Sequence, residues 1–318
     1  MPLFNRSRLI IKPLSERESK TYLSSIVDPD STPQSVSDYE LSKLERVVLS
    51  INKSKRRQAP IVFAFGAHLV KNGLSKILIE LMKKGYVQHI LSNEAVVIHD
   101  WELAFQGKTE EDVRRYVAEG QFGLWNEPGK AIASAIKTGA KKNIGYGESI
   151  GRFINRDSKL GIMHPNKEIS LLWQAYKLEI PFSVGVTIGQ NIHHTHPELN
   201  FSDLGKVGGI DFLKFVDTIS KFQNGTYISI GSAILSPQIF EKALSMARNV
   251  NRSLNDYRIY VNDIQPSEWD WSNGEPPKTS PAYYLRFMKT FSRMGGQSEY
   301  IEMNNTAFLH NLYHLLTR

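Results

Sequence analysis

The sequence predicts a doubly wound α/β sheet, mostly parallel, of about six strands with helices on both faces. Two observations carry this prediction. Ile61–Phe65 is a short, almost wholly apolar run of the kind typical of strands buried on both faces, and further strand patterns such as Thr226–Ile230 recur along the chain. Between them apolar residues return at helical spacing, as at Leu74, Ile77 and Leu81.

The stretch from Ile61 to Leu91 has the pattern of one strand–helix–strand unit with tight joints. The crossover of such a unit is right-handed, and ligands of these sheets bind at the carboxyl ends of the strands. Those ends carry Gly66–His68 and Ser92–Glu94. Both segments are therefore candidate site loops.

The rest of the chain continues the alternation. We expect residues 1–58 to form an N-terminal extension with an amphipathic helix, and residues 59–318 to form one α/β domain. A helical insertion is expected at about residues 107–160, with Thr109 capping its first helix. Further strands are expected at residues 182–188, 226–230, 257–261 and 300–303.

Composition excludes several classes of protein. The 318 residues are 41% hydrophobic and 22% charged, which is ordinary globular composition, and the absence of cysteine excludes disulfides and thiolate metal sites. The net charge of +7 is scattered, and its densest cluster, residues 53–57, is interpreted as a solvated helix end, so we expect no nucleic-acid partner. No apolar run has the length of a membrane span and no secretory signal is evident, so we expect a cytoplasmic protein without a membrane partner.

The standard nucleotide motifs are absent. Neither G-x-G-x-x-G nor the Walker A pattern occurs. Phosphate can still bind at a helix N-terminus, where backbone N–H groups are free. Gly66, Gly189 and Gly231 each join the end of a strand pattern to the start of a helix. We expect a polar ligand pocket where these glycines and Ser92 converge.

Histidines supply the chemical candidates. His193, His194 and His196 share one polar loop and could ligate a metal with Glu198 or Asp203, or could contact a substrate. We favour substrate contact and expect no metal.

A second group of candidates lies nearer the first strand unit. His99 next to Asp100 suggests a general base held by a carboxylate. His68 and Glu94 lie at neighbouring predicted strand ends, where a cofactor would bind. Each of these residues could instead have a structural role.

Several segments carry a family resemblance, in the same order along the chain. They are Gly66–Leu81, Val87–Asp100, Gly151–Asn155, Glu168–Tyr176, Ile180–Phe182, Tyr227–Ala233 and Ile259–Asn262. Together they resemble the deoxyhypusine synthase family over roughly residues 60–318. The resemblance implies a Rossmann-like, NAD-binding sheet and a homo-oligomer, dimer or tetramer, because the sites of that family lie between subunits. The positions it implies for contact with NAD are Gly66, His68, Asn93, Glu94, Gly231, Ser232, Asp263 and Asn305.

Departures from the family limit the expected reaction. The element that carries the family's catalytic lysine corresponds to Ala282–Phe287, which has no lysine. The family's K-H-H becomes Leu235–Pro237, and its T-D-G-S loop becomes Ile188–Asn191. Covalent transfer through an enzyme lysine therefore lacks its nucleophile.

These observations lead to one expected function and two alternatives. We expect a protein that binds NAD or a related small metabolite and acts on an amine or amino acid without making deoxyhypusine. His99 and Asp100 are the expected acid–base residues, and Asn191, His193, His194 and His196 the expected contacts to a small polar substrate. The alternatives are a metal-assisted hydrolase that uses the three histidines of the loop, and a non-catalytic ligand-binding paralogue.

Overall fold

The computed structural model describes residues 2–156 and 161–318, so residues 157–160 of the predicted insertion lie outside the described residues. Its centre is a six-stranded parallel sheet with the order β5-β3-β2-β6-β7-β8. The strands are β2 (Ile61–Phe65), β3 (His89–Asn93), β5 (Phe182–Gly185), β6 (Thr226–Ile230), β7 (Arg258–Asp263) and β8 (Gln297–Glu302). The predicted α/β fold class is confirmed.

The strand order determines where a ligand can bind. From β2 the chain adds β3 and β5 on one side, and it then returns to add β6, β7 and β8 on the other side. The first strands of the two halves, β2 in one and β6 in the other, are therefore neighbours, and the strand order reverses between them. In open sheets of this kind, ligands bind outside the carboxyl ends of the strands at this reversal, the topological switch point.

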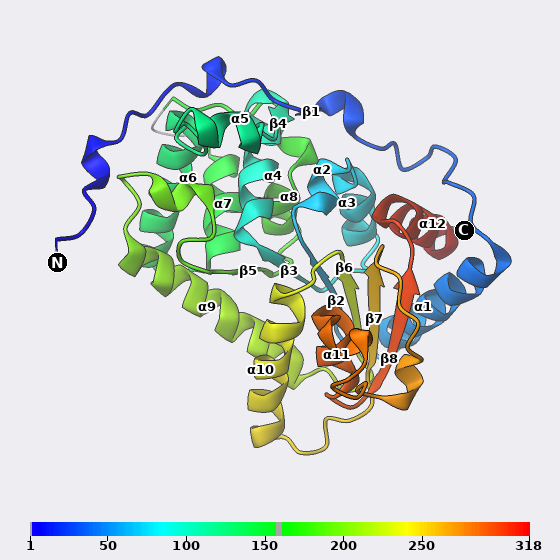
Figure 1. Cartoon of the computed structure of the whole chain (residues 1–318). Helices are drawn as coiled ribbons and strands as arrows, with labels where there is room; N and C mark the ends of the chain where they lie inside the picture. The colour runs from blue at the N-terminus through cyan, green and yellow to red at the C-terminus, as the bar shows by residue number, and fades with distance from the viewer. Residues whose placement is uncertain (1, 157–160) are drawn as a thin grey trace.

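Helices cover both faces of the sheet (Figure 1). They are α1 (Asp38–Arg56), α2 (His68–Lys71), α3 (Ser75–Lys83), α4 (Glu94–Gln106), α5 (Val113–Ala118), α6 (Asn126–Lys142), α7 (Tyr146–Asn155), α8 (Leu171–Lys177), α9 (Phe201–Ser220), α10 (Leu235–Val250), α11 (Arg286–Ser292) and α12 (Asn305–Thr317). Alternate side chains of β2 enter two cores: Phe63 and Phe65 pack with α1, α3 and α12, whereas Val62 and Ala64 pack with α9, α10 and α11. This two-sided burial explains the continuous apolar runs in the sequence.

The joint between β3 and α4 differs from the prediction. The strand ends at Asn93, two residues later than its apolar run suggests, and the Asn93 side chain accepts a hydrogen bond from the backbone N–H of Val96 at 3.3 Å. Asparagine is a favourable N-cap, so α4 begins at once at Glu94. His99 and Asp100, which the sequence placed beyond a strand end, therefore lie inside α4.

The start of the predicted insertion also differs. Thr109 does not cap a helix but lies in the short strand β4 (Lys108–Thr109), which pairs with β1 (Thr21–Tyr22) of the N-terminal segment. The cap of α5 is Asp112, whose carboxylate accepts from the backbone N–H of Arg115 at 3.0 Å. Of the predicted insertion, α5, α6 and α7 are the helices that the structure describes.

Residues 2–37, here called the N-terminal arm, run across the side of the molecule where the strands end (Figure 1). The arm contains three short 3₁₀ helices and β1. α1, which follows it, is capped by Ser37 and packs Leu44, Val47 and Ile51 into the same core as β2. The first 58 residues therefore share a core with the sheet.

In the loop of residues 265–278, which follows β7, two tryptophans donate hydrogen bonds to other residues of the same loop. Trp271 is buried and donates to the Ser267 hydroxyl, while Trp269 donates to the Gly274 carbonyl. In the described part of the chain, no helix combines the length and the apolar character needed to cross a membrane.

Candidate functional site

The backbone comes close together at the switch point. A Cβ atom added to Gly66, after β2, would lie 3.2 Å from the Gly231 carbonyl oxygen, and one added to Gly231 would lie 3.0 Å from the Asn305 side chain. Gly231 has φ +55°, in the left-handed region that favours glycine. Asn93 is the next neighbour, with its side-chain nitrogen 3.9 Å from the Gly66 Cβ position. Four of the predicted cofactor residues therefore meet at one place.

Asn262 adds a polar group that the sequence did not single out for the site. Its backbone carbonyl accepts from the Gly231 N–H at 2.9 Å, and its side-chain nitrogen donates to the carbonyls of Ile301 and Met303. Its side-chain oxygen is buried without a hydrogen-bond partner among the described residues. A buried acceptor of this kind gains from a ligand that donates to it.

The other predicted cofactor residues have mixed positions. Ser232 accepts from the backbone N–H of Ser236 at 3.3 Å near the start of α10. Asp263 ends β7, and its carboxylate accepts from the Gln265 N–H at 3.1 Å. His68 is exposed at the start of α2. All three lie at or just after strand ends, but the structure gives Ser232 and Asp263 local hydrogen bonds.

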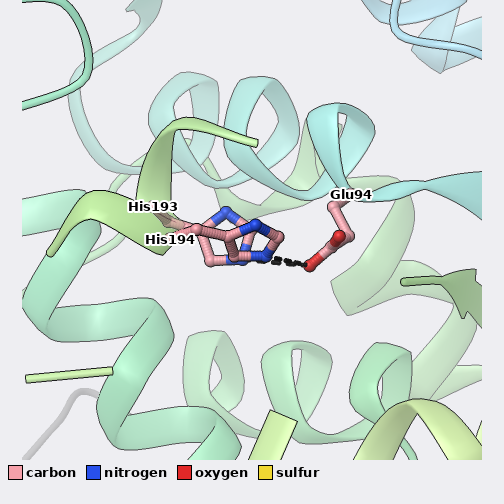
Figure 2. A group of neighbouring side chains, drawn as sticks. All are labelled: Glu94, His193 and His194. Atoms are coloured by element: carbon pink, nitrogen blue, oxygen red, sulfur yellow. Dashed lines mark hydrogen bonds and ion pairs between the residues drawn. The ribbon is translucent and has the colours of Figure 1, made fainter. Parts of the chain in front are cut away.

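The remaining cofactor residue, Glu94, belongs to a second group (Figure 2). The Nε2 atoms of His193 and His194 lie 3.1 and 3.0 Å from the same carboxylate oxygen, Oε1. The other oxygen accepts from the Thr187 N–H at 3.1 Å and from the Asn191 side chain at 2.9 Å. Because Glu94 follows Asn93 directly, this group adjoins the switch point.

Glu94 is a buried, fully hydrogen-bonded anion. Burial alone would raise the pKa of its carboxyl group, but the hydrogen bonds from His193 and His194 lower that pKa to about 2. The predicted substrate residues Asn191, His193 and His194 are thus brought together, and the residue that joins them is one the sequence had assigned to the cofactor.

The proton positions of His194 bear on the metal alternative. The ligand atoms of Glu94, His193 and His194 lie within 4.8 Å of one another, a spacing that could hold an ion. However, the Gly189 N–H donates to Nδ1 of His194 at 3.0 Å, so the proton of neutral His194 is on Nε2. A metal ligand needs the Nε2 lone pair and normally donates its other N–H to an acceptor. The arrangement at His194 therefore does not fit a metal ion.

His193 has a different environment. Its Nε2 atom lies 3.0 Å from the hydroxyl of buried Tyr146, and its Nδ1 atom is buried without a partner among the described residues. Burial lowers the pKa of His193, so its neutral form is favoured. Tyr146, at the start of α7, was not predicted, because nothing in its local sequence marks it.

His196 does not join the group. Its ring packs against Gly129, where an added Cβ would lie 2.2 Å from the ring, and its Nδ1 accepts from the Glu198 N–H at 3.3 Å. The hydrolase alternative with all three histidines around one metal therefore does not match the geometry. The loop is held by Arg6, whose guanidinium donates to the carbonyls of His194, His196 and Leu199 at 2.8 to 2.9 Å.

The expected pairing of His99 with Asp100 needs correction. Asp100 accepts from the Ser170 hydroxyl at 2.5 Å and from the N–H groups of Leu171 and Leu172 at 2.7 and 3.2 Å, so it supports the start of α8. Burial raises its pKa to about 6. Successive side chains of a helix point in different directions, which is why His99 faces other residues. Whether His99 takes part in catalysis stays a prediction.

His99 is connected to a different carboxylate. Its Nδ1 atom lies 2.7 Å from the Thr109 hydroxyl, which donates to Glu102 at 2.5 Å. Glu102 is fully buried and pairs with Arg17 of the N-terminal arm at 2.7 and 2.8 Å. Nothing in the local sequence marks these contacts, because Arg17 and Glu102 lie far apart along the chain.

Two open cavities lie away from this edge of the sheet, and a third, of about 670 Å³, lies between α9 and α10 beside the end of β5. One of about 980 Å³ lies between α1 and β8, and one of about 950 Å³ lies among α7, α8 and α9 at the start of β5. Among the described residues, none of the predicted site residues lines either cavity. The evidence for a site at the carboxyl edge is therefore its polar groups and close backbone approach.

No protein-family model and no curated protein matches the sequence. Solved structures do match. Unliganded AgrE has a TM-score of 0.51 and 17% identity, over 89% of this chain and 34% of AgrE. A conserved protein classed as LOR/SDH from Methanococcus maripaludis S2 has a TM-score of 0.50 and 16% identity, over 91% of this chain and 73% of that one.

These likenesses show the shared fold alone. The chain spans about a third of the length of AgrE, of which it covers 34%. A structure from Entamoeba histolytica classed as deoxyhypusine synthase has a TM-score of 0.47 and 9% identity, over 88% of each chain. The resemblance to that family therefore stays a prediction.

Proposed function

We propose that this chain binds NAD or a related nucleotide at the switch point and is an enzyme acting on an amine or amino acid. The observation that carries the proposal is the contact of Gly66 with Gly231, where the strand order reverses. Side chains are absent there, so a dinucleotide can approach the backbone closely, as the pyrophosphate does in doubly wound sheets. The buried oxygen of Asn262 offers it an acceptor.

The substrate is proposed to lie beside the nucleotide, against the loop that carries Asn191, His193 and His194. Glu94 places a buried negative charge there, which favours a cationic group such as a protonated amine. His99 is proposed to transfer the proton, through the ring nitrogen that faces away from Thr109. A protein with the same fold, AgrE, has been crystallised with ornithine and NAD⁺, so these two compounds are the first to test.

Nucleotide binding is tested by titrating the protein with NADH and following NADH fluorescence. We expect saturable binding in the wild type and a Kd about tenfold higher in Gly66→Ala, because the added methyl group meets the Gly231 carbonyl. Gly205→Ala is the matched control, since a Cβ atom at Gly205 in α9 meets nothing within 4 Å. Equal affinity in both variants would place the nucleotide elsewhere, and no binding would refute the proposal.

Activity is tested by mixing the protein with NAD⁺ and L-ornithine, L-arginine or L-lysine and measuring NADH. Product formation that His99→Gln reduces strongly would support the proposed role of His99. If the protein binds NADH but forms none with any of the three amino acids, the result would favour a non-catalytic ligand-binding protein.

We further propose that the protein does not make deoxyhypusine. The position of the resembling family's lysine corresponds to Phe287, or to Arg286 with a shift of one residue. Phe287 is buried and packs on Tyr300 with ring centroids 5.5 Å apart. The test is incubation with NAD, labelled spermidine and the translation-factor acceptor. Label on the acceptor at an ordinary enzymatic rate would contradict the proposal.

A homo-oligomer, dimer or tetramer, remains part of the proposal, on the strength of the family resemblance. Light scattering at micromolar protein concentration distinguishes it from a monomer. A monomeric mass would count against sites shared between subunits.

A further inference from the structure

We propose that Thr109 and Glu102 hold the proton of His99 on Nδ1, so that His99 presents Nε2 as its base, and that Arg17 makes the N-terminal arm part of this device. The inference rests on the proposed function, since it assigns positioning residues to the His99 named there. The carboxylate that orients His99 is then Glu102, acting through the Thr109 hydroxyl, and not the neighbouring Asp100.

The direction of each hydrogen bond follows from the number of protons available. Arg17 donates from two guanidinium nitrogens to both oxygens of Glu102, at 2.7 and 2.8 Å. In this bidentate ion pair the carboxylate of Glu102 only accepts hydrogen bonds. Thr109 has a single hydroxyl proton, and Oε2 of Glu102 lies 2.5 Å away, so that proton goes to Glu102.

With its proton used, the Thr109 oxygen can only accept. The atom 2.7 Å away on its other side is Nδ1 of His99, which must therefore carry the N–H. The reverse arrangement, with Thr109 donating to His99, would leave two oxygens 2.5 Å apart with no hydrogen between them. In neutral imidazole a proton on Nδ1 leaves the lone pair on Nε2, as a carboxylate does for the histidine of a catalytic triad.

The surroundings keep His99 neutral. The pKa of His99 is lowered to about 4, chiefly by burial; the positive charges of Lys71 and Arg17 also lower it, whereas Glu102 and Glu110 raise it. These four charged residues come from α2, the arm, α4 and the segment after β4. At neutral pH, His99 therefore has a free lone pair and can accept a proton at Nε2.

The N-terminal arm contributes through the buried ion pair between Arg17 and Glu102. Arg17 is 3% exposed and Glu102 is 0% exposed, so each charge depends on the other. β1 pairs with β4 and places Thr21 opposite Thr109, which fixes the strand that carries the Thr109 hydroxyl. Both ends of the chain of contacts from Arg17 to His99 thus depend on the N-terminal arm.

The test measures the tautomer of His99 directly, in full-length protein labelled with ¹⁵N-histidine, by NMR at neutral pH. His99→Gln identifies the signal. We expect Nδ1–H in the wild type, retention of that signal in Thr109→Ser, which keeps the hydroxyl, and its loss in Thr109→Val, which is similar in shape. Thr195→Val is the control, since Thr195 is exposed and its hydroxyl bonds only locally to the Ile192 carbonyl.

The outcomes separate this inference from the proposed function. An Nε2–H tautomer in the wild type, or an unchanged His99 signal in Thr109→Val, would overturn the inference even if NADH binds. If the expected tautomer is found but neither NADH nor any amine is used, the inference stands and the proposed function fails. With an active protein, Thr109→Val should reduce turnover at least tenfold with KM nearly unchanged, and Thr109→Ser should restore most of it.

Discussion

Replacing Arg17 by methionine should strongly destabilise the protein. The Arg17 guanidinium lies in the interior and makes two short hydrogen bonds to Glu102. Methionine keeps much of the apolar stem but leaves the Glu102 charge buried, with Thr109 as its remaining donor. Removing one partner of a buried pair costs about 3–5 kcal/mol, because the other charge stays uncompensated.

The expected loss can be bounded by two further variants. Arg17→Met combined with Glu102→Leu removes both charges, and such apolar replacements of buried pairs are often neutral or even stabilising, so the double variant should recover most of the loss. Arg46→Met is the surface control, because Arg46 makes an equally short pair with Glu299 but both side chains are accessible to water. Surface pairs contribute little.

The assay is urea denaturation at 25 °C, followed by circular dichroism, with the free energy of unfolding extrapolated to water. The order of stability should be wild type, Arg46→Met just below it, and Arg17→Met several kcal/mol lower. If Arg17→Met loses no more than Arg46→Met, or if the double variant is less stable than Arg17→Met alone, the buried pair is not what anchors the arm.

Two other predictions concern the histidines. In Arg6→Ala the amides of residues 192–196 should exchange hydrogen faster than in the wild type, because three carbonyls lose their donor; unchanged exchange would show that the loop is held otherwise. The pKa of His99 is lowered by burial to about 4, so folding favours the neutral ring, and this contribution is present above about pH 6.5 and lost as pH falls toward 4. His99→Gln should therefore lose about 3 kcal/mol less stability over that range than the wild type, measured by urea denaturation at each pH; equal losses would refute the shift.

The fold could be predicted because its signals are local. β2 and β6 are buried on both faces; β2 is apolar throughout, and the polar residues of β6, Thr226 and Ser229, are hydrogen-bonded to other buried side chains. Gly66 and Gly231 were found as candidates for the same reason, since each follows one of these strands. The side-by-side position of these two glycines was available only through the assumption of a doubly wound sheet.

The boundaries of β3 were less predictable, because pairing sets them. Phe65 of β2 pairs with Ser92, and Asn93 pairs with Gly185 of β5, so the ladder continues two residues beyond the apolar run. The polar end of the strand then becomes the cap of α4. His99 and Asp100 therefore lie within α4, where they have separate partners.

The roles of the histidines depend on atoms that are remote in sequence. From the sequence, Asp100 was the expected partner of His99, whereas His194 was expected to contact a substrate or, in the alternative, to ligate a metal. In the structure Thr109 fixes the proton of His99 on Nδ1, whereas Gly189 fixes that of His194 on Nε2. His99 therefore has Nε2 available for a ligand, whereas both ring nitrogens of His194 are hydrogen-bonded to the protein. The difference between the two histidines thus comes from the group that is hydrogen-bonded to Nδ1, a threonine hydroxyl for His99 and a backbone N–H for His194. Neither contact can be recognised from the sequence.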